Sequence, residues 1–327
     1  MRQRSVRTVL ALALVTMSGQ ALAQQPETLV PVFGWKPGLE ALVTTTQRMV
    51  QTGQGRDSDL TISIQQRMRV SEHQQGLLVS HLDGQLLEAT ALPPGTENPV
   101  LDLYRSLGTA DAHYVISGEG ELLSLEGVAK TAEAVRTALA PMLESVQNTP
   151  ETAQLVGMVE AALSDEAMLA SVADQWSSMT VMWAGQELEE AAVYGFELEE
   201  PNPLAPTLLI PMSVEISYQG RVACEEGGSA SDCVLLEFRS YPEPEAFAAF
   251  LQSFIEQLVP EAATRSVDYD FEQLNSITVV TEPDTLVPHR FSTSRQMELT
   301  VSFEGQSFGM SRLNSTDQQF DYETRRR

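Results

Sequence analysis

The feature that most constrains this chain is a long run of alternating apolar and polar residues in its second half. The apolar members share one parity and are Leu208, Ile210, Met212, Val214, Ile216, Tyr218 and Val222. A period of two is typical of a β-strand with one buried face. Compact domains seldom hold a straight strand of this length, so we expect it to curve, with Pro211 and Gly220 as bend or bulge points.

Similar alternation predicts strands on both sides of this run. In the first half the apolar positions are Leu60, Ile62, Ile64, Met68 and Val70, then Leu78, Leu82 and Leu86. Near the C-terminus they are Ile277, Val279, Met297, Leu299, Val301, Phe303, Phe308, Met310, Phe320 and Tyr322. A hairpin is expected around Gly118-Glu119-Gly120. Strands that follow one another without crossover helices pair antiparallel, so we predict an antiparallel sheet.

In the middle of the chain the apolar spacing changes to that of helices. Residues at spacings of three and four predict one face of an amphipathic helix that begins at Asp165: Met168, Val172, Trp176, Met179 and Trp183. Further helical stripes are expected within 135–146 and 247–258. A sheet with one apolar face has to cover that face, and helices are the available cover. The predicted fold is therefore α+β: a strongly curved antiparallel β-sheet, or half-barrel, with helices packed on the concave face and a helical insertion.

The order of these patterns divides the chain into four segments. Residues 1–23 are expected to be a signal peptide, 24–127 N-terminal antiparallel strands, 128–183 a helical insertion, and 184–327 C-terminal antiparallel strands with one helix. The insertion separates two sheets or two halves of one sheet. We expect residues 24–327 to form one composite domain.

The N-terminal segment has the parts of a secretory signal peptide. Three arginines precede an apolar stretch at residues 8–17, and residues 21–23 are the small-x-small pattern that signal peptidase reads. We predict cleavage between Ala23 and Gln24 and export to the periplasm, with an extracellular location as the alternative. No later run reaches about 18 apolar residues, so the mature chain is not expected to span a membrane.

The chain is strongly acidic. It has 327 residues, carries a formal net charge of −25 at pH 7 and contains only two lysines, Lys36 and Lys130. Contact with phosphates requires clustered Lys and Arg, so nucleic acid is not an expected partner, and anionic membrane surfaces would repel the chain. The hydrophobic fraction of 43% is too high for a disordered chain and allows a sizeable core.

Cys224 and Cys233 flank the polar loop 225–232, which lies between two strand-like runs. In an exported protein, two such cysteines are expected to form a disulfide bond that closes a hairpin. A catalytic redox pair is normally closer in sequence, as in Cys-x-x-Cys. A metal site is not expected, because no histidine lies near these cysteines in the sequence.

Catalytic motifs are absent from the sequence. It contains no Gly-x-Ser-x-Gly, His-Glu-x-x-His, phosphate-loop or Rossmann pattern. The four histidines, His73, His81, His113 and His289, lack the spacing of metal ligands, although His73 and His81 could approach each other across a hairpin. We therefore expect no catalytic residues, no metal and no cofactor. An enzyme of unrecognised type is kept as an alternative, because active sites can be assembled from residues distant in sequence.

A resemblance to a known group enters at residues 281–290, which precede a long alternating hairpin ending in Phe320-Asp321-Tyr322. This arrangement resembles the closing strands of exported bacterial envelope proteins of the lipoprotein-carrier (LolA/LppX-like) half-barrel group. The stretch 176–185 is similar to exported proteins of the same broad group. The resemblance implies an apolar cavity between sheet and helices that can hold an acyl chain. The chain departs from the group in having a larger helical block.

Two hypotheses for function follow. In the first, a non-enzymatic periplasmic protein binds or carries a lipid-like hydrophobic ligand in a cavity between sheet and helices. The candidate lining residues are Met168, Val172, Trp176, Met179, Trp183, Met212, Val214 and Ile216. In the second, these residues are plain core, and the protein is a structural or interaction protein of the cell envelope with a dry interior. A cavity of roughly several hundred cubic ångströms would favour the first hypothesis.

Overall fold

The computed structural model describes residues 27–53, 57–90, 111–127, 132–133, 136–137, 164–201, 209–243, 247, 267–303 and 306–322. The predicted signal peptide and its cleavage site between Ala23 and Gln24 lie outside the described residues. The same holds for most of the helical stripes expected at 135–146 and 247–258. No helix within the described ranges combines the length and the apolar character needed to cross a membrane.

The described chain is mostly strand. The helical elements are the α-helix α4 (Asp165–Trp176) and a π-helical turn (Ser177–Val181) that continues it. The strands are β1 (Thr28–Leu29), β2 (Glu40–Gly53), β3 (Ser58–His73), β4 (Gly76–Thr90), β5 (Ala112–Ile116), β6 (Leu122–Glu126), β7 (Leu188–Glu189), β8 (Val193–Pro201), β9 (Leu209–Val222), β10 (Cys233–Pro242), β11 (Val267–Thr281), β12 (Pro288–Phe303) and β13 (Gln306–Asp321).

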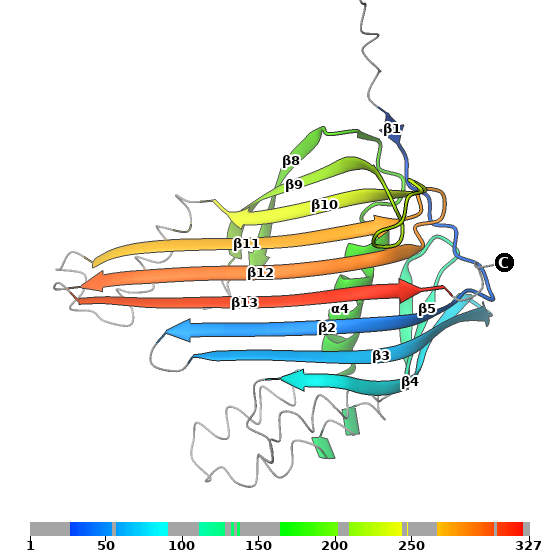
Figure 1. The fold of residues 1–327 in the computed structure, drawn as a ribbon, viewed down its shortest axis with the longest axis horizontal. Coiled ribbons are helices and arrows are strands. Elements are labelled where there is room, and N and C mark those ends of the chain that lie inside the picture. Colours follow the sequence, from blue (N-terminus) through cyan, green and yellow to red (C-terminus); the bar gives the residue numbers. More distant parts are fainter. Residues whose placement is uncertain are drawn as a thin grey trace, which may run out of the picture.

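Eleven of these strands form one curved sheet in the order β6-β5-β4-β3-β2-β13-β12-β11-β10-β9-β8. Every neighbouring pair in it is antiparallel. The strands β2 and β13, which come from opposite ends of the chain, pair near the middle, so strands on both sides of the helical segment share this sheet. Figure 1 shows α4 behind the long strands. The predicted curved antiparallel sheet with helical cover on one face is confirmed.

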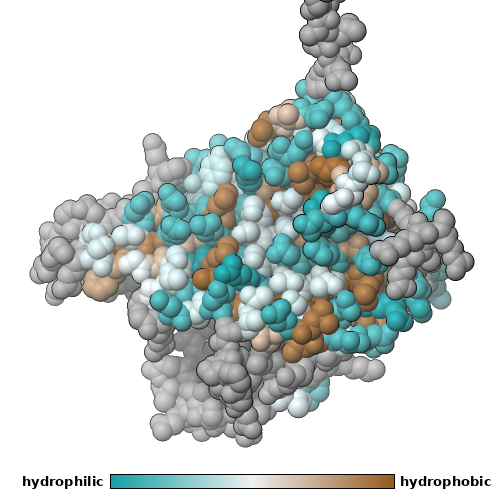
Figure 2. Space-filling view, viewed as in Figure 1, coloured by the Kyte–Doolittle hydropathy of each residue, from teal (hydrophilic) through white to brown (hydrophobic). Residues whose placement is uncertain are grey.

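The face turned away from α4 is polar. Neighbouring strands exchange contacts across it, among them the ion pairs Arg48–Asp59 at 2.8 Å and Arg69–Glu40 at 2.7 Å. Figure 2 shows this face as mostly hydrophilic, with scattered hydrophobic patches. The alternation in sequence thus places one parity outward and the other against the helix, as a period of two requires.

The concave face carries the larger apolar core. Leu236, Val279 and Phe291 are fully buried on the sheet side, and Trp183 is fully buried on the helical side. Side chains on neighbouring strands stand beside one another here, because the cross-strand partners of Val279 are Leu236 and Phe291. This register aligns the apolar residues of several strands beneath the C-terminal end of the helical segment.

Three aromatic rings fix the end of α4 to the sheet. The Trp176 ring lies edge-on to Trp35, with the ring centroids 5.1 Å apart, and 6.5 Å from the ring of Phe33. Its indole N–H donates to the Gly120 carbonyl at 2.6 Å, and that of Trp35 donates to the Leu286 carbonyl at 3.0 Å. Buried indoles need such partners, so these bonds set where the helix ends on the sheet.

The helical segment changes its winding at Trp176. At its start, the Ser164 hydroxyl accepts from the Ala167 N–H at 3.2 Å, a typical N-cap. After Trp176 the chain adopts a π-helical turn, in which the Thr180 hydroxyl donates to the Trp176 carbonyl at 2.8 Å. The single amphipathic helix predicted through Trp183 is therefore an α-helix followed by a wider turn. The turn keeps Met179 buried despite the change in winding.

Bulges interrupt β4 and β9, and only the one in β4 departs from the expected pattern. At the start of β4 the buried apolar residues are Leu77 and Val79, not Leu78 as the parity predicts. A register shift follows near Asp83, which has a φ of 56°, so the two halves of β4 do not share one parity. In β9 the predicted bulge at Gly220 is confirmed, because the pairing with β10 shifts there and Gly220 has a φ of 115°.

We expect Gly120→Ala to destabilise the fold. Gly120 has a φ of 91°, and a Cβ at this position would lie 2.6 Å from the Phe33 ring. Both the strained backbone and the displaced ring should lower the free energy of unfolding, by about 2 kcal/mol or more. Urea denaturation followed by tryptophan fluorescence measures the change.

Gly118→Ala is the matched control in the same turn. No atom lies within 4 Å of its added Cβ, so we expect a change within about 0.5 kcal/mol. Equal stability of the two variants would contradict this account of the turn.

Candidate functional site

A large cavity lies between the concave face of the sheet and the helical segment. Its volume is about 1250 Å³, and its walls come from several central strands and from α4 with the turn that follows. Small-molecule sites usually span about 300–1,000 Å³, so this space is large enough for a sizeable ligand. The cavity is the main candidate functional site among the described residues.

One part of the cavity wall is apolar. Phe291 and Phe320 contribute from the sheet, and Trp176, Met179 and Met182 contribute from the helical side. Phe291 is fully buried in the core, so the apolar surface that faces the cavity comes from half-buried side chains such as Val172, Met182 and Phe238. Methionine and aromatic side chains form an adaptable surface that suits a flexible apolar group.

Further along the same strands the wall becomes polar. On β12 the inward positions after Phe291 are Thr293 and Arg295, and their partners on β13 are Thr316 and Asn314. Asn275 on β11 is the other partner of Arg295. These residues occupy the parity that is apolar elsewhere on the strands. The cavity is therefore mixed in polarity, whereas the resemblance implied an apolar one.

A second apolar cluster lies beyond this polar region. It consists of Ile210, Met212 and Phe247, with Leu198, Phe271 and Leu299 packed against them. The Phe247 and Phe271 rings are stacked, with centroids 3.9 Å apart. A smaller cavity of about 480 Å³ lies beside these rings. The concave face thus presents a polar region between two apolar clusters.

Charged groups of both signs line the large cavity. Arg295 projects from β12, Glu200 from β8 and Asp174 from α4. Burial raises the pKa of Glu200, as does the negative charge of Asp174, while the positive charge of Arg295 and a hydrogen bond from Ser240 lower it. The three charges therefore act on one another inside the same space.

His81 and Tyr114 form an uncharged part of the wall. Their ring centroids are 5.4 Å apart, and both side chains line the cavity. Burial, with a smaller contribution from the positive charge of nearby His113, lowers the pKa of His81 to about 4. Burial raises the pKa of Tyr114 to about 12. Both side chains are therefore neutral near pH 7.

The structure places only some of the eight predicted lining residues on the cavity wall. Val172, Trp176 and Met179 line the cavity. Trp183, Met212 and Val214 are buried in the packed interior. Met168 and Ile216 are half-buried, and Ile216 packs against the larger core. Their role in binding a ligand stays a prediction.

The polar lining residues were missed by the sequence reading, although a signal for them exists. Asn275, Thr293, Arg295, Asn314 and Thr316 share the parity of the apolar residues on their strands. A polar residue at a position expected to be buried is a signal for a functional surface.

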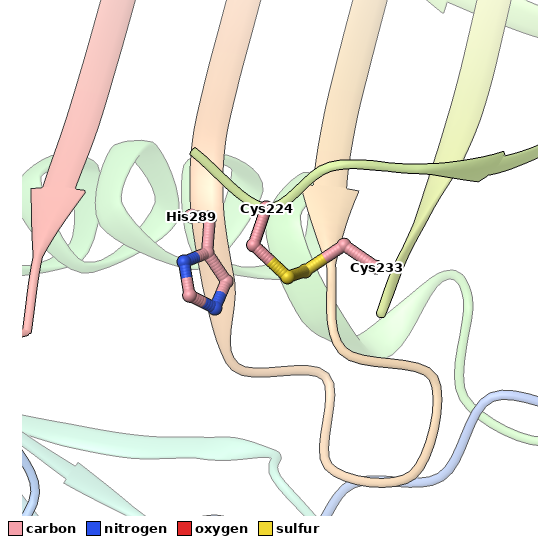
Figure 3. Close-up of side chains that lie close together, drawn as sticks. All are labelled: Cys224, Cys233 and His289. Carbon is pink, nitrogen blue, oxygen red and sulfur yellow. A yellow bond between two sulfur atoms is a disulfide. The ribbon is translucent and has the colours of Figure 1, made fainter. Parts of the chain in front are cut away.

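Cys224 and Cys233 form the predicted disulfide bond. His289 lies beside it, and its ring and the two sulfur atoms lie within 4.8 Å of one another (Figure 3). Sequence reasoning expected no histidine near the cysteines. The loop 282–287 between β11 and β12 brings His289 there, which the spacing along the chain does not reveal. Thiolates are the sulfur ligands of metals, so the oxidised pair does not offer a metal site.

His289 also contacts the carboxylate of Glu282. Its Nε2 lies 3.4 Å from Glu282 Oε1, and Thr285 donates to the second oxygen of Glu282 at 2.8 Å. Burial lowers the pKa of His289, as does the charge of Arg290, whereas Glu225 raises it. The arrangement packs an imidazole against the disulfide at the edge of the core.

One hydroxyl–imidazole contact has the form of a catalytic pair. Ser80 Oγ lies 2.9 Å from His113 Nδ1. Within the described ranges, no carboxylate forms a hydrogen bond with His113. A nucleophile also needs its base to be oriented by a third group, and the described residues do not supply one. That the protein is not an enzyme stays a prediction.

No protein-family model matches the chain, and no curated protein matches it. Among solved structures the chain is similar to lipovitellin, in a structure concerned with lipid–protein interactions. The sequence identity is 8%, the TM-score is 0.40, and the match covers 88% of this chain and 25% of the lipovitellin chain. The chain thus spans about a quarter of that protein's length, and a likeness of this size carries no argument about its ligand. The resemblance to lipoprotein carriers stays a prediction.

Acid should destabilise the fold through His81. The unfolded chain binds a proton there near the ordinary pKa of 6.5, whereas the folded chain binds it near 4. The resulting loss of stability is absent above pH 6.5 and grows as the pH falls towards 4, reaching up to about 3 kcal/mol. We expect His81→Gln to remove this part of the acid sensitivity, as measured by chemical denaturation at neutral pH and at about pH 5.

His73→Gln, at the end of β3, controls for the loss of a histidine as such. The titratable groups beside His81 are Tyr114 and His113. If the free energy of unfolding depended on pH identically in His81→Gln and in the unaltered protein, the neutral His81 imidazole would not be a source of the acid sensitivity.

The disulfide should contribute about 2–3 kcal/mol to stability, because it closes a short loop in the unfolded chain. We expect the double variant Cys224→Ser, Cys233→Ser to lose this amount in urea denaturation. The unaltered protein measured with a reductant should match the double variant. Intact mass after alkylation tests the bond itself, and two alkylated thiols in native protein would contradict it.

Proposed function

We propose that the protein is a non-enzymatic, exported binding protein that holds an amphipathic lipid-like molecule in the concave cavity. The observation that carries this proposal is the cavity of about 1250 Å³, whose wall has both an apolar and a polar part. Core packing normally leaves few voids larger than a water molecule. A cleft of this size is far larger than such voids and has room for a ligand.

The chemistry of the wall favours an amphipathic occupant over a purely hydrophobic one. Val172, Met182 and Phe238 are half-buried and offer apolar contacts, whereas Thr293 and Asn314 offer hydrogen bonds elsewhere on the same wall. Burying these polar groups against an acyl chain alone would leave them without partners, which costs free energy. A molecule with one polar and one apolar part satisfies both regions.

The alternative is a structural or interaction protein of the envelope with a dry core. It is supported by the tightly packed larger core, where Trp183, Leu236 and Phe291 are fully buried. Such a protein has no need of a mixed cavity beside that core, so we place it second.

Export is the second part of the proposal. The disulfide between Cys224 and Cys233 is typical of an oxidising compartment, such as the periplasm or the extracellular space. The formal net charge of −25 makes nucleic acid an unsuitable partner. The proposed partner is a lipid-like small molecule.

Protein purified without detergent should release a lipid. We expect organic extraction followed by mass spectrometry to detect a stoichiometric amphiphile, and the emptied protein to take up a hydrophobic fluorophore. Clean extracts together with no uptake of the fluorophore would contradict the proposal.

A tryptophan placed in the cavity should block binding. Thr293→Trp fills the cavity wall, so we expect at least about a tenfold loss of fluorophore affinity. Thr300→Trp is the matched control, because Thr300 lies on the same strand with the opposite parity. Equal affinity of the two variants would place the fluorophore elsewhere.

A further inference from the structure

Four side chains form a polar track across the concave face: Arg295 on β12, Asn275 on β11, Ser240 on β10 and Glu200 on β8. Arg295 and Asn275 are cross-strand partners. Asn275 Nδ2 donates to Ser240 Oγ at 3.1 Å, and Ser240 lies near enough to Glu200 to lower the pKa of that carboxyl group. Ser240 is fully buried, so its hydroxyl is positioned by these partners rather than by solvent.

The two ends of the polar track carry opposite charges. Arg295 is an exposed side chain on the cavity wall, and no hydrogen bond or ion pair joins it to any residue in the described part of the chain. Its guanidinium therefore presents unused N–H donors to the cavity. Glu200 at the other end and Asp174 on the facing helix supply the negative charge.

This charge arrangement discriminates among headgroups. A purely anionic headgroup at Arg295 would also face the carboxylates of Glu200 and Asp174, and like charges in a partly desolvated space repel. A purely cationic headgroup would face Arg295. A headgroup with both signs can place its anion at Arg295 and its cation at the carboxylates.

We propose that the polar track binds the headgroup of a zwitterionic amphiphile of the phosphate-and-ammonium class, with the phosphate at Arg295 and the ammonium at Glu200 and Asp174. This inference rests on the proposed function, because it names the class of lipid held in the cavity. The apolar clusters on either side of the track receive the acyl part. One contains Phe291, and the other contains Phe247 and Phe271.

The test compares probes that share one palmitoyl chain and differ only in the headgroup. Lysophosphatidylethanolamine is the zwitterion, lysophosphatidate is the anion and monopalmitoylglycerol is uncharged. Their ability to displace a bound hydrophobic fluorophore gives relative affinities. We expect the affinity of the zwitterion to be at least about tenfold higher than that of either other probe. Its headgroup can form charge-assisted hydrogen bonds at both ends of the track without repulsion between like charges.

Variants then assign the two ends of the track. Arg295→Gln should lower the affinity for the zwitterion about tenfold and leave the affinity for monopalmitoylglycerol unchanged. Arg295→Lys should restore part of the lost affinity. Glu200→Gln should lower the affinity for the zwitterion, whose ammonium loses a partner, and raise the affinity for the anion, which loses a repelling charge. Arg239→Gln is the matched control, because Arg239 pairs with Glu237 at 3.2 Å on the opposite face of β10. It should change none of the affinities.

Each remaining outcome is decisive. Equal binding of all three probes, or an equal loss for all three in Arg295→Gln, would overturn the headgroup assignment and leave the proposed function standing. Failure of all three probes to bind would overturn the proposed function together with this inference. Glycerophosphoethanolamine, which has no acyl chain, should bind far more weakly. Affinity equal to that of the lysolipid would assign the track to a soluble zwitterion instead.

Discussion

The fold depends on a mismatch in size between a broad curved sheet and the short helix that packs against it. The twelve residues of α4 extend for about 18 Å, whereas eleven strands spaced by about 4.8 Å extend for about 48 Å. Among the described elements, the helical segment therefore covers only part of the concave face. Where it covers the sheet, the residues are apolar and buried. Further along the strands the lining is polar, and the cavity is the space between.

The tryptophans decide which part of the sheet is covered. Trp176 and Trp35 bond to backbone carbonyls of other segments, so the end of the helix has a fixed place on the sheet. The π-helical turn then carries Met179 and Trp183 into the core. One end of the cavity wall is therefore built against this core.

Sequence reasoning was sufficient for the sheet and insufficient for the cavity. Strict alternation in β9 and β12 predicted strands with one buried face, because the period of two is a local property. The parity of β4 was wrong at Leu78, since a bulge near Asp83 changes the face and leaves no strong local signature. The disulfide was predictable from its short loop, but the nearby His289 was not, because its approach depends on the loop between β11 and β12.

The polar track shows the limit of pattern reading most clearly. The apolar residues of each strand were read as the core, and the polar residues of the same parity, Asn275 and Arg295, were passed over. Their alignment depends on the register between strands, which the sequence does not display. The concave face therefore carries apolar and polar residues on the same parity, which a plain core does not.

The central claim is that a lipid-like molecule occupies the mixed-polarity cavity on the concave face, beside Arg295. An electron-density map of protein purified without detergent tests it most directly. The account predicts continuous elongated density between α4 and the sheet, with its polar end next to the Arg295 guanidinium. A space filled by the protein's own side chains, with no such density, would contradict it.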